Sequence, residues 1–180
     1  MIKSTVQKAG LAVFQTSGNP GYSLVLYFEP GVQLIEPPGD SQSAAVQLLL
    51  KWLTTFDTNE STKERLKIKV NVLNAESCGI PAWALKYNGH GCMLTKSNRM
   101  TRLQGRTKSG LECSVVECDV DLREWNLLCR QGVNSILPIL GNIDFTLALI
   151  IQGESDNELP EQVLGLVRLN FLDLERAQKW

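Results

Sequence analysis

The sequence lacks any apolar run long enough to cross a bilayer, and it carries little net charge. A membrane-spanning helix needs about 20 mostly apolar residues, whereas the longest apolar segment, Phe145 to Ile151, is short and is interrupted by Thr146. The formal net charge is −1, so no field of the whole molecule draws it to nucleic acid or to anionic lipid. Any such attraction must come from a local group of charges.

Few residues are available for catalysis or for metal binding. The sequence has one histidine, His90, and no phosphate-binding loop of the Gly-x-x-x-x-Gly-Lys-Ser/Thr type. His90, Cys92, Cys113 and Cys118 lack the paired spacing that is typical of structural zinc sites. We therefore expect no enzymatic activity, no cofactor, no metal and no small-molecule substrate, and we expect the cysteines to be reduced and to pack as small apolar residues.

The length and composition are those of an ordinary globular domain. Hydrophobic residues make up 43% and charged residues 21% of the chain, which separates it from disordered sequences. A length of 180 residues predicts a single domain over residues 1–180. Met1 to Leu11 contains two lysines and no long apolar stretch, unlike a secretory signal. We therefore expect a cytoplasmic protein.

Periodic patterns of apolar residues predict both strands and helices. Alternation of apolar and polar residues favours strands at Tyr22 to Phe28, Leu66 to Val72 and Ile143 to Ile151. A helix is expected after Asp40 or Ser41, either of which is a suitable N-cap, and its apolar stripe runs from Ala44 to Phe56. The pattern predicts an α+β fold, a mostly antiparallel twisted sheet packed against two or three helices.

Weaker signals predict the remaining elements. Short strands are expected at Leu11 to Phe14 and at Val32 to Ile35, and a strand followed by a short helix is expected between Val163 and Phe171. Glycines and prolines interrupt the segment from Asn74 to Ser109, which predicts mostly irregular structure with one helical turn around Trp83 and a strand near Met100 to Gln104.

Two further features are expected after residue 110. The apolar phase of the strand from Leu111 to Val120 shifts at Val115 and Val116, and a β-bulge there would keep both sets of apolar side chains inward. Asp121 is expected to cap a helix that ends at Gly132.

Residues 86–109 form the most polarised segment of the chain. This irregular basic segment contains six cations and no acidic residue, and Lys67 and Lys69 add two cations on the outer face of a predicted strand. Together they predict a basic patch that binds the phosphates of RNA or of anionic lipid. The alternative is that neighbouring acids such as Glu117 and Asp119 neutralise these cations. The candidate binding residues are Lys67, Lys69, Lys86, Lys96, Arg99, Arg102, Arg106 and Lys108.

The order of these segments resembles that of the matrix proteins of rhabdoviruses, in particular the short plant-infecting, cytorhabdovirus-like members. The resemblance covers the strand from Tyr22 to Phe28, the helix ending near Trp52, the Lys-rich strand from Leu66 to Val72, the basic segment and the strand from Leu111 to Val120. It implies a non-enzymatic structural protein of the virion that self-associates, condenses ribonucleoprotein and attaches peripherally to anionic membrane. Such a protein is found in the host cytoplasm and in the virion.

Two alternatives remain open on the sequence. One is an RNA-binding accessory protein of a plant virus, either a movement protein or a silencing suppressor, which binds nucleic acid without polymerising. The other is a cellular adaptor domain that binds peptides, whose sign would be an exposed apolar patch or an open sheet edge.

Overall fold

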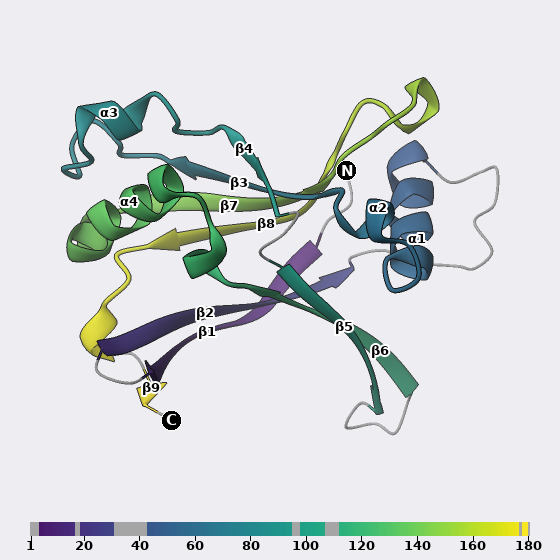
Figure 1. Cartoon of the computed structure of the whole chain (residues 1–180), viewed down its shortest axis with the longest axis horizontal. Coiled ribbons are helices and arrows are strands. Elements are labelled where there is room, and N and C mark those ends of the chain that lie inside the picture. The colour runs from purple at the N-terminus through teal and green to yellow at the C-terminus, as the bar shows by residue number, and fades with distance from the viewer. Residues whose placement is uncertain are drawn as a thin grey trace.

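The computed structural model describes residues 4–16, 19–30, 43–94, 98–106, 112–176 and 178–179. It shows antiparallel sheets that pack with a few helices (Figure 1). The predicted α+β fold class is therefore confirmed.

A four-stranded antiparallel sheet of order β4-β3-β7-β8 lies at the centre of the structure (Figure 1). Its strands are β3 (Leu66–Val72), β4 (Gly91–Met93), β7 (Asp144–Ile151) and β8 (Val163–Asn170). The register pairs Leu66 with Ile151 and Val72 with Phe145. Because side chains alternate between the faces of a sheet, the apolar residues of β3 share one face with Phe145, Leu147, Leu149 and Ile151 of β7. Lys67 lies on the other face, beside Ile150.

Two hairpins accompany this sheet. They are formed by β1 (Ser4–Thr16) with β2 (Asn19–Pro30) and by β5 (Asn98–Arg106) with β6 (Glu112–Val120). The short strand β9 (Gln178–Lys179) pairs in parallel with β1, and β1 lies beside β8. The β5–β6 hairpin extends away from the sheet at the lower right of Figure 1.

The helices lie at the ends of the central sheet. The α-helices are α1 (Ala44–Thr55), α2 (Glu60–Lys63), α3 (Ala82–Leu85) and α4 (Leu127–Ile136), and the 3-10 helices are η1 (Leu122–Glu124), η2 (Leu137–Asn142), η3 (Asp156–Glu158) and η4 (Leu174–Arg176). Helix α1 buries the face that carries Leu48 and Trp52, and the Trp52 ring stacks on Phe56 at a centroid distance of 5.2 Å.

The buried apolar residues form two clusters at opposite ends of the central sheet. One joins α1 to the sheet and to the β5–β6 hairpin, and its buried members are Leu48, Trp52, Phe56, Leu66, Leu94 and Ile151. The other lies at the start of β7, where residues of η2 and β2 pack against it, and its buried members are Val72, Cys78, Ile143, Phe145, Val167 and Leu169. The first cluster positions the hairpin that is described below.

The strongest periodic patterns predicted their elements correctly. The helix at Ala44 and the strand from Leu66 to Val72 are present as predicted. The strand at Leu11 to Phe14 is part of the longer β1. The predicted N-caps at Asp40 and Ser41 and the strand at Val32 to Ile35 lie outside the described residues, and α1 is preceded by Ser43, whose side chain makes no capping bond.

Two local predictions were wrong, and a third was right in part. The β5–β6 register runs without a shift from Asn98–Val120 to Arg106–Glu112, so β6 has no bulge at Val115. Asp121 caps a short helix as predicted, since its side chain accepts from the Arg123 N–H, but this helix is only η1, and α4 follows it with Asn126 as its own N-cap. Helix α4 continues past Gly132, where a Cβ atom would lie 4.0 Å from the Trp83 ring. Strand β4 was not predicted because it has only three residues.

Candidate interaction surface

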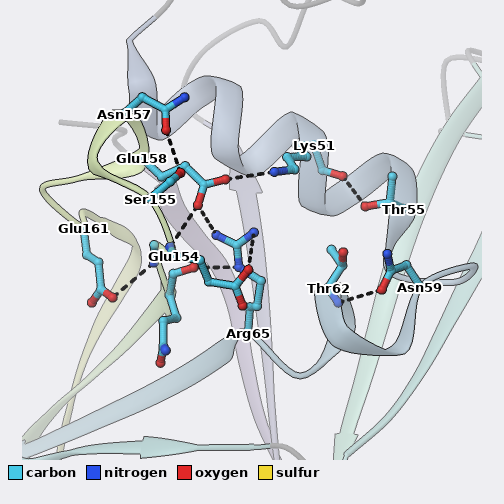
Figure 2. Close-up of polar contacts among 12 residues, drawn as sticks. Lys51, Thr55, Asn59, Thr62, Arg65, Glu154, Ser155, Asn157, Glu158 and Glu161 are labelled. Atoms are coloured by element: carbon cyan, nitrogen blue, oxygen red, sulfur yellow. Dashed lines mark hydrogen bonds and ion pairs between the residues drawn. The ribbon is translucent and has the colours of Figure 1, made fainter.

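An ion-pair network holds the β7–β8 loop against α1 and the start of β3 (Figure 2). Arg65 is at its centre and is 4% exposed. Its Nε donates to the carbonyl oxygen of Gln152 at 2.7 Å, and its Nη2 donates to Oε2 of Glu158 at 2.7 Å. A buried guanidinium needs such partners, because an unpaired buried charge is strongly destabilising.

Glu158 is the buried acid of this network, at 9% exposed. Lys51 Nζ donates to its Oε1 at 2.9 Å, and the Glu154 backbone N–H donates to its Oε2 at 2.9 Å. Burial raises the pKa of the Glu158 carboxyl, but the Glu154 N–H, Lys51 and Arg65 outweigh it and lower this pKa to about 2. Glu158 is therefore ionised at neutral pH and stabilises the loop.

Lys67 belongs to the same region. Its Nζ donates to both carboxylate oxygens of Glu161 at 2.7 Å, and Glu161 also accepts from the Gly153 N–H at 3.2 Å. Lys69, two residues further along β3, is exposed and makes no ion pair within the described part of the chain. Of the two predicted binding lysines of β3, one is therefore already paired.

Arg102 anchors the β5–β6 hairpin to the end of α1. Its Nε donates to Oδ2 of Asp57 at 3.0 Å, its Nη2 donates to the Leu53 carbonyl oxygen, and its guanidinium lies 4.8 Å from the centre of the Phe56 ring. The hydrogen bond from Arg102 lowers the pKa of Asp57. Met100 of the same strand packs against the buried cluster of α1. This face of the hairpin is therefore the attached face.

The opposite face of the hairpin is exposed. The register places Arg99 across from Asp119, Thr101 across from Glu117 and Leu103 across from Val115. Leu103 and Val115 are 45% and 47% exposed. The continuous register thus turns Val115 outward, whereas the predicted bulge would have placed it in the core.

Within the part of the chain that the structure describes, nothing pairs with the outer edges of this hairpin. Neither β5 nor β6 forms a backbone hydrogen bond with another described element, and no other described strand lies beside either one. The edge of β3 is different, because the Asn88 amide donates to the Val72 carbonyl oxygen at 2.9 Å and accepts from the Val72 N–H at 2.7 Å. Proteins usually cover free strand edges in this way.

The eight predicted binding cations lie in separate parts of the structure. Lys67 and Lys69 are on β3, whereas Arg99 and Arg102 are on opposite faces of β5. Lys86 lies 4.9 Å from the centre of the Tyr87 ring. Arg106 ends β5, but the direction of its side chain is not described, and Lys96 and Lys108 lie outside the described residues. Binding of RNA or of anionic lipid by these residues stays a prediction.

The residues considered for metal binding or catalysis show no arrangement of that kind where they are described. His90 is exposed and meets the Tyr87 ring edge-on at 6.4 Å. Burial raises the pKa of the Cys92 thiol and that of Cys118, the latter to about 11. Among the described residues, no three His, Cys, Asp or Glu side chains are grouped so that they could hold a metal ion. No described helix combines the length and apolar character that crossing a bilayer requires.

A family model described as "Protein ENHANCED DISEASE RESISTANCE 2, C-terminal" matches residues 3–173. The match covers nearly the whole sequence. The chain belongs to the ENHANCED DISEASE RESISTANCE 2 C-terminal family. Searches among curated proteins and among solved structures gave no match.

Membership of the ENHANCED DISEASE RESISTANCE 2 C-terminal family corrects the expected origin of the protein. The resemblance to rhabdovirus matrix proteins is wrong, and so is the description as a structural protein of the virion, because the match points to a cellular protein. The resemblance rested on the order and length of segments, and these are common to many small α+β domains. Of the possibilities that the sequence left open, the cellular adaptor domain agrees with the family.

Proposed function

We propose that this chain is a cellular recognition domain without catalytic activity, and that it binds an extended polypeptide segment as an added strand on the β5–β6 hairpin. The observation that carries the proposal is the pair of open edges on strands of nine residues each. An extended segment that pairs with such an edge gains main-chain hydrogen bonds. This mode of binding requires no pocket.

The exposed face of the hairpin supplies a place for side chains of the bound segment. Leu103 and Val115 lie opposite each other and are both about half exposed. An apolar residue of an added strand would cover one of them, because side chains on neighbouring strands lie next to each other on the same face. Burial of this apolar surface stabilises the complex.

The attachment of the hairpin supports the same function. The hairpin is held at one face by Met100, Val116 and Cys118, which pack on the α1 cluster, and by the contacts of Arg102. Its opposite face is exposed, and no described residue pairs with either edge. A rigid strand pair with free edges loses little conformational entropy when a segment binds.

Binding to a short synthetic peptide of alternating threonine and valine tests the proposal. We expect the peptide to slow amide exchange in β5 or β6 and not in β3 or β7, because the added strand protects the edge with which it pairs. Fluorescence anisotropy of a labelled peptide gives the affinity. Leu103→Lys should weaken binding by several-fold, and Leu166→Lys, at an equally exposed position on β8, is the matched control.

N-methylated versions of the same peptide separate strand addition from non-specific adhesion. Methyl groups on alternate backbone nitrogens block one edge of the peptide and leave its side chains unchanged. The peptide with methyl groups on the edge that pairs with the hairpin should bind at least about tenfold more weakly, because several main-chain hydrogen bonds of about 1 kcal/mol each are removed. The peptide methylated on the other alternate nitrogens should retain its affinity. Equal affinity of the two methylated peptides, or unchanged amide exchange in β5 and β6, would contradict the proposal.

A further inference from the structure

The two open edges of the hairpin differ in their exposed charge. On the outward face of β6, Val115, Glu117 and Asp119 follow one another at alternate positions, and all three are exposed. Glu117 and Asp119 form no hydrogen bond or ion pair within the described part of the chain. Strand β6 therefore presents one apolar and two anionic side chains in a row.

Among its side chains that the structure describes, strand β5 presents no equivalent row of free cations. Arg102, its central cation, points inward and binds Asp57 and the Leu53 carbonyl oxygen. Arg99 is exposed, but the register places it opposite Asp119 of the same hairpin. Glu117 has Thr101 as its cross-strand neighbour and thus has no opposite charge across from it.

From this asymmetry we infer that β6 is the receiving strand, and that its partner is an extended basic segment with cations at alternating positions followed by an apolar residue. This inference rests on the proposed function. In the added strand, two cations would lie beside Glu117 and Asp119, and the apolar residue would lie beside Val115. Cross-strand pairs of opposite charge stabilise a sheet, whereas like charges in the same place oppose pairing.

A second copy of the chain is the competing partner for β6, and the charges of Glu117 and Asp119 affect its binding. Pairing of β6 with β6 of another copy brings two anionic strands together, which opposes a symmetric dimer. Pairing of β6 with β5 of another copy would not meet this repulsion. Light scattering over a range of protein concentrations distinguishes that arrangement, because head-to-tail pairing continues into longer assemblies.

Two probes matched to the threonine–valine peptide test the inference. In one probe lysine replaces two successive threonines and valine replaces the next one, and in the other glutamate replaces the same two threonines, so that both probes carry an apolar residue beside Val115. We expect the lysine probe to bind about tenfold more tightly than the glutamate probe, from two favourable cross-strand pairs in place of two unfavourable ones. Glu117→Lys should remove or reverse this preference, while Glu175→Lys, an exposed position in η4, should leave it unchanged.

The outcomes separate the inference from the proposed function. If both probes bind the hairpin equally well, or if the glutamate probe binds better, the assignment of a basic partner to β6 fails and strand addition survives. Absence of hairpin protection with all three peptides overturns strand addition itself. Growth of assemblies with concentration, reversed by Glu117→Lys, would identify a second copy as the occupant and would overturn the basic-segment inference.

Discussion

The β7–β8 loop and the β5–β6 hairpin both carry many charged residues, but they use them in different ways. In the loop, Glu158 and Glu161 accept from Arg65, Lys51 and Lys67, and the central pair is buried. On the hairpin, Glu117 and Asp119 are exposed and form no ion pair within the described residues. The difference lies in whether another element is close enough to supply a partner. Charges with partners fix the fold, and charges without them are available for binding.

The largest effect is expected from breaking the loop network at its centre. Arg65→Met removes the buried cation beside Glu158 and leaves it only Lys51 and the Glu154 N–H as partners, so the free energy of unfolding should fall by about 3 kcal/mol. Urea denaturation followed by circular dichroism measures this change. Arg176→Met is the matched control, because its pair with Asp173 is exposed, and a loss there should stay below about 1 kcal/mol. Equal losses in both variants would show that the network has no special role.

Acid should weaken the same network without a mutation. The pKa of Glu158 is about 2 in the folded chain against an ordinary value of 4.5. A carboxyl with a lowered pKa stabilises the fold above its ordinary pKa, and this contribution is lost as the pH falls from about 4.5 towards about 2. Unfolding measured across this range should show a steeper loss of stability in the natural chain than in Glu158→Gln. Parallel curves for the two proteins would refute the assignment.

A substitution at Asn88 tests the difference between the covered edge of β3 and the open edges of β5 and β6. Asn88→Ala removes both hydrogen bonds to Val72 and exposes the edge of β3, which should lower stability by about 1–2 kcal/mol. Amide exchange should increase at Val72 and Gly89. If the threonine–valine peptide then protects β3 as well as the hairpin, an open edge is sufficient for strand addition. An unchanged exchange pattern would mean that Asn88 does not cover this edge.

The smallest effects are expected on the hairpin itself. Arg102→Met removes the contact with the Phe56 ring, the ion pair with Asp57 and the hydrogen bond to the Leu53 carbonyl oxygen, and partly exposed contacts of the first two kinds contribute at most about 1 kcal/mol each. Faster amide exchange should be confined to β5 and β6. Arg99→Met should change stability and exchange less than Arg102→Met does, because Arg99 is exposed and forms no ion pair with a described residue. A larger effect at Arg99 than at Arg102 would reverse the assignment of the two faces.

Sequence patterns predicted the elements whose side chains have a strong period. Helix α1 and strand β3 were predicted because each buries one face against the core, and burial of one face produces the period. Strand β5 was predicted near Met100 to Gln104 but runs over Asn98–Arg106. Its two ends were not predicted because charged and polar residues there interrupt the alternation of apolar and polar residues. The bulge predicted at Val115 assumed that every apolar side chain of β6 is buried. The structure instead exposes Val115 beside Leu103.

The candidate surface was only partly predictable. Arg102 and Arg99 look alike in the sequence and were both assigned to a basic patch, but strand alternation turns one towards Asp57 and the other outward. Glu117 and Asp119 were considered only as neutralising neighbours. No sequence signal marked Arg65 and Glu158 as a buried pair, because 93 positions separate them along the chain.

The sequence by itself determined the α+β class, the helix at Ala44 and the central strands, because these depend on local periodicity. Only the tertiary structure decided which charges are paired and which strand edges are open. Ion pairs and strand edges depend on residues that are distant in sequence and meet only when the chain is folded. The same applies to the outward turn of Val115, which depends on its register with β5.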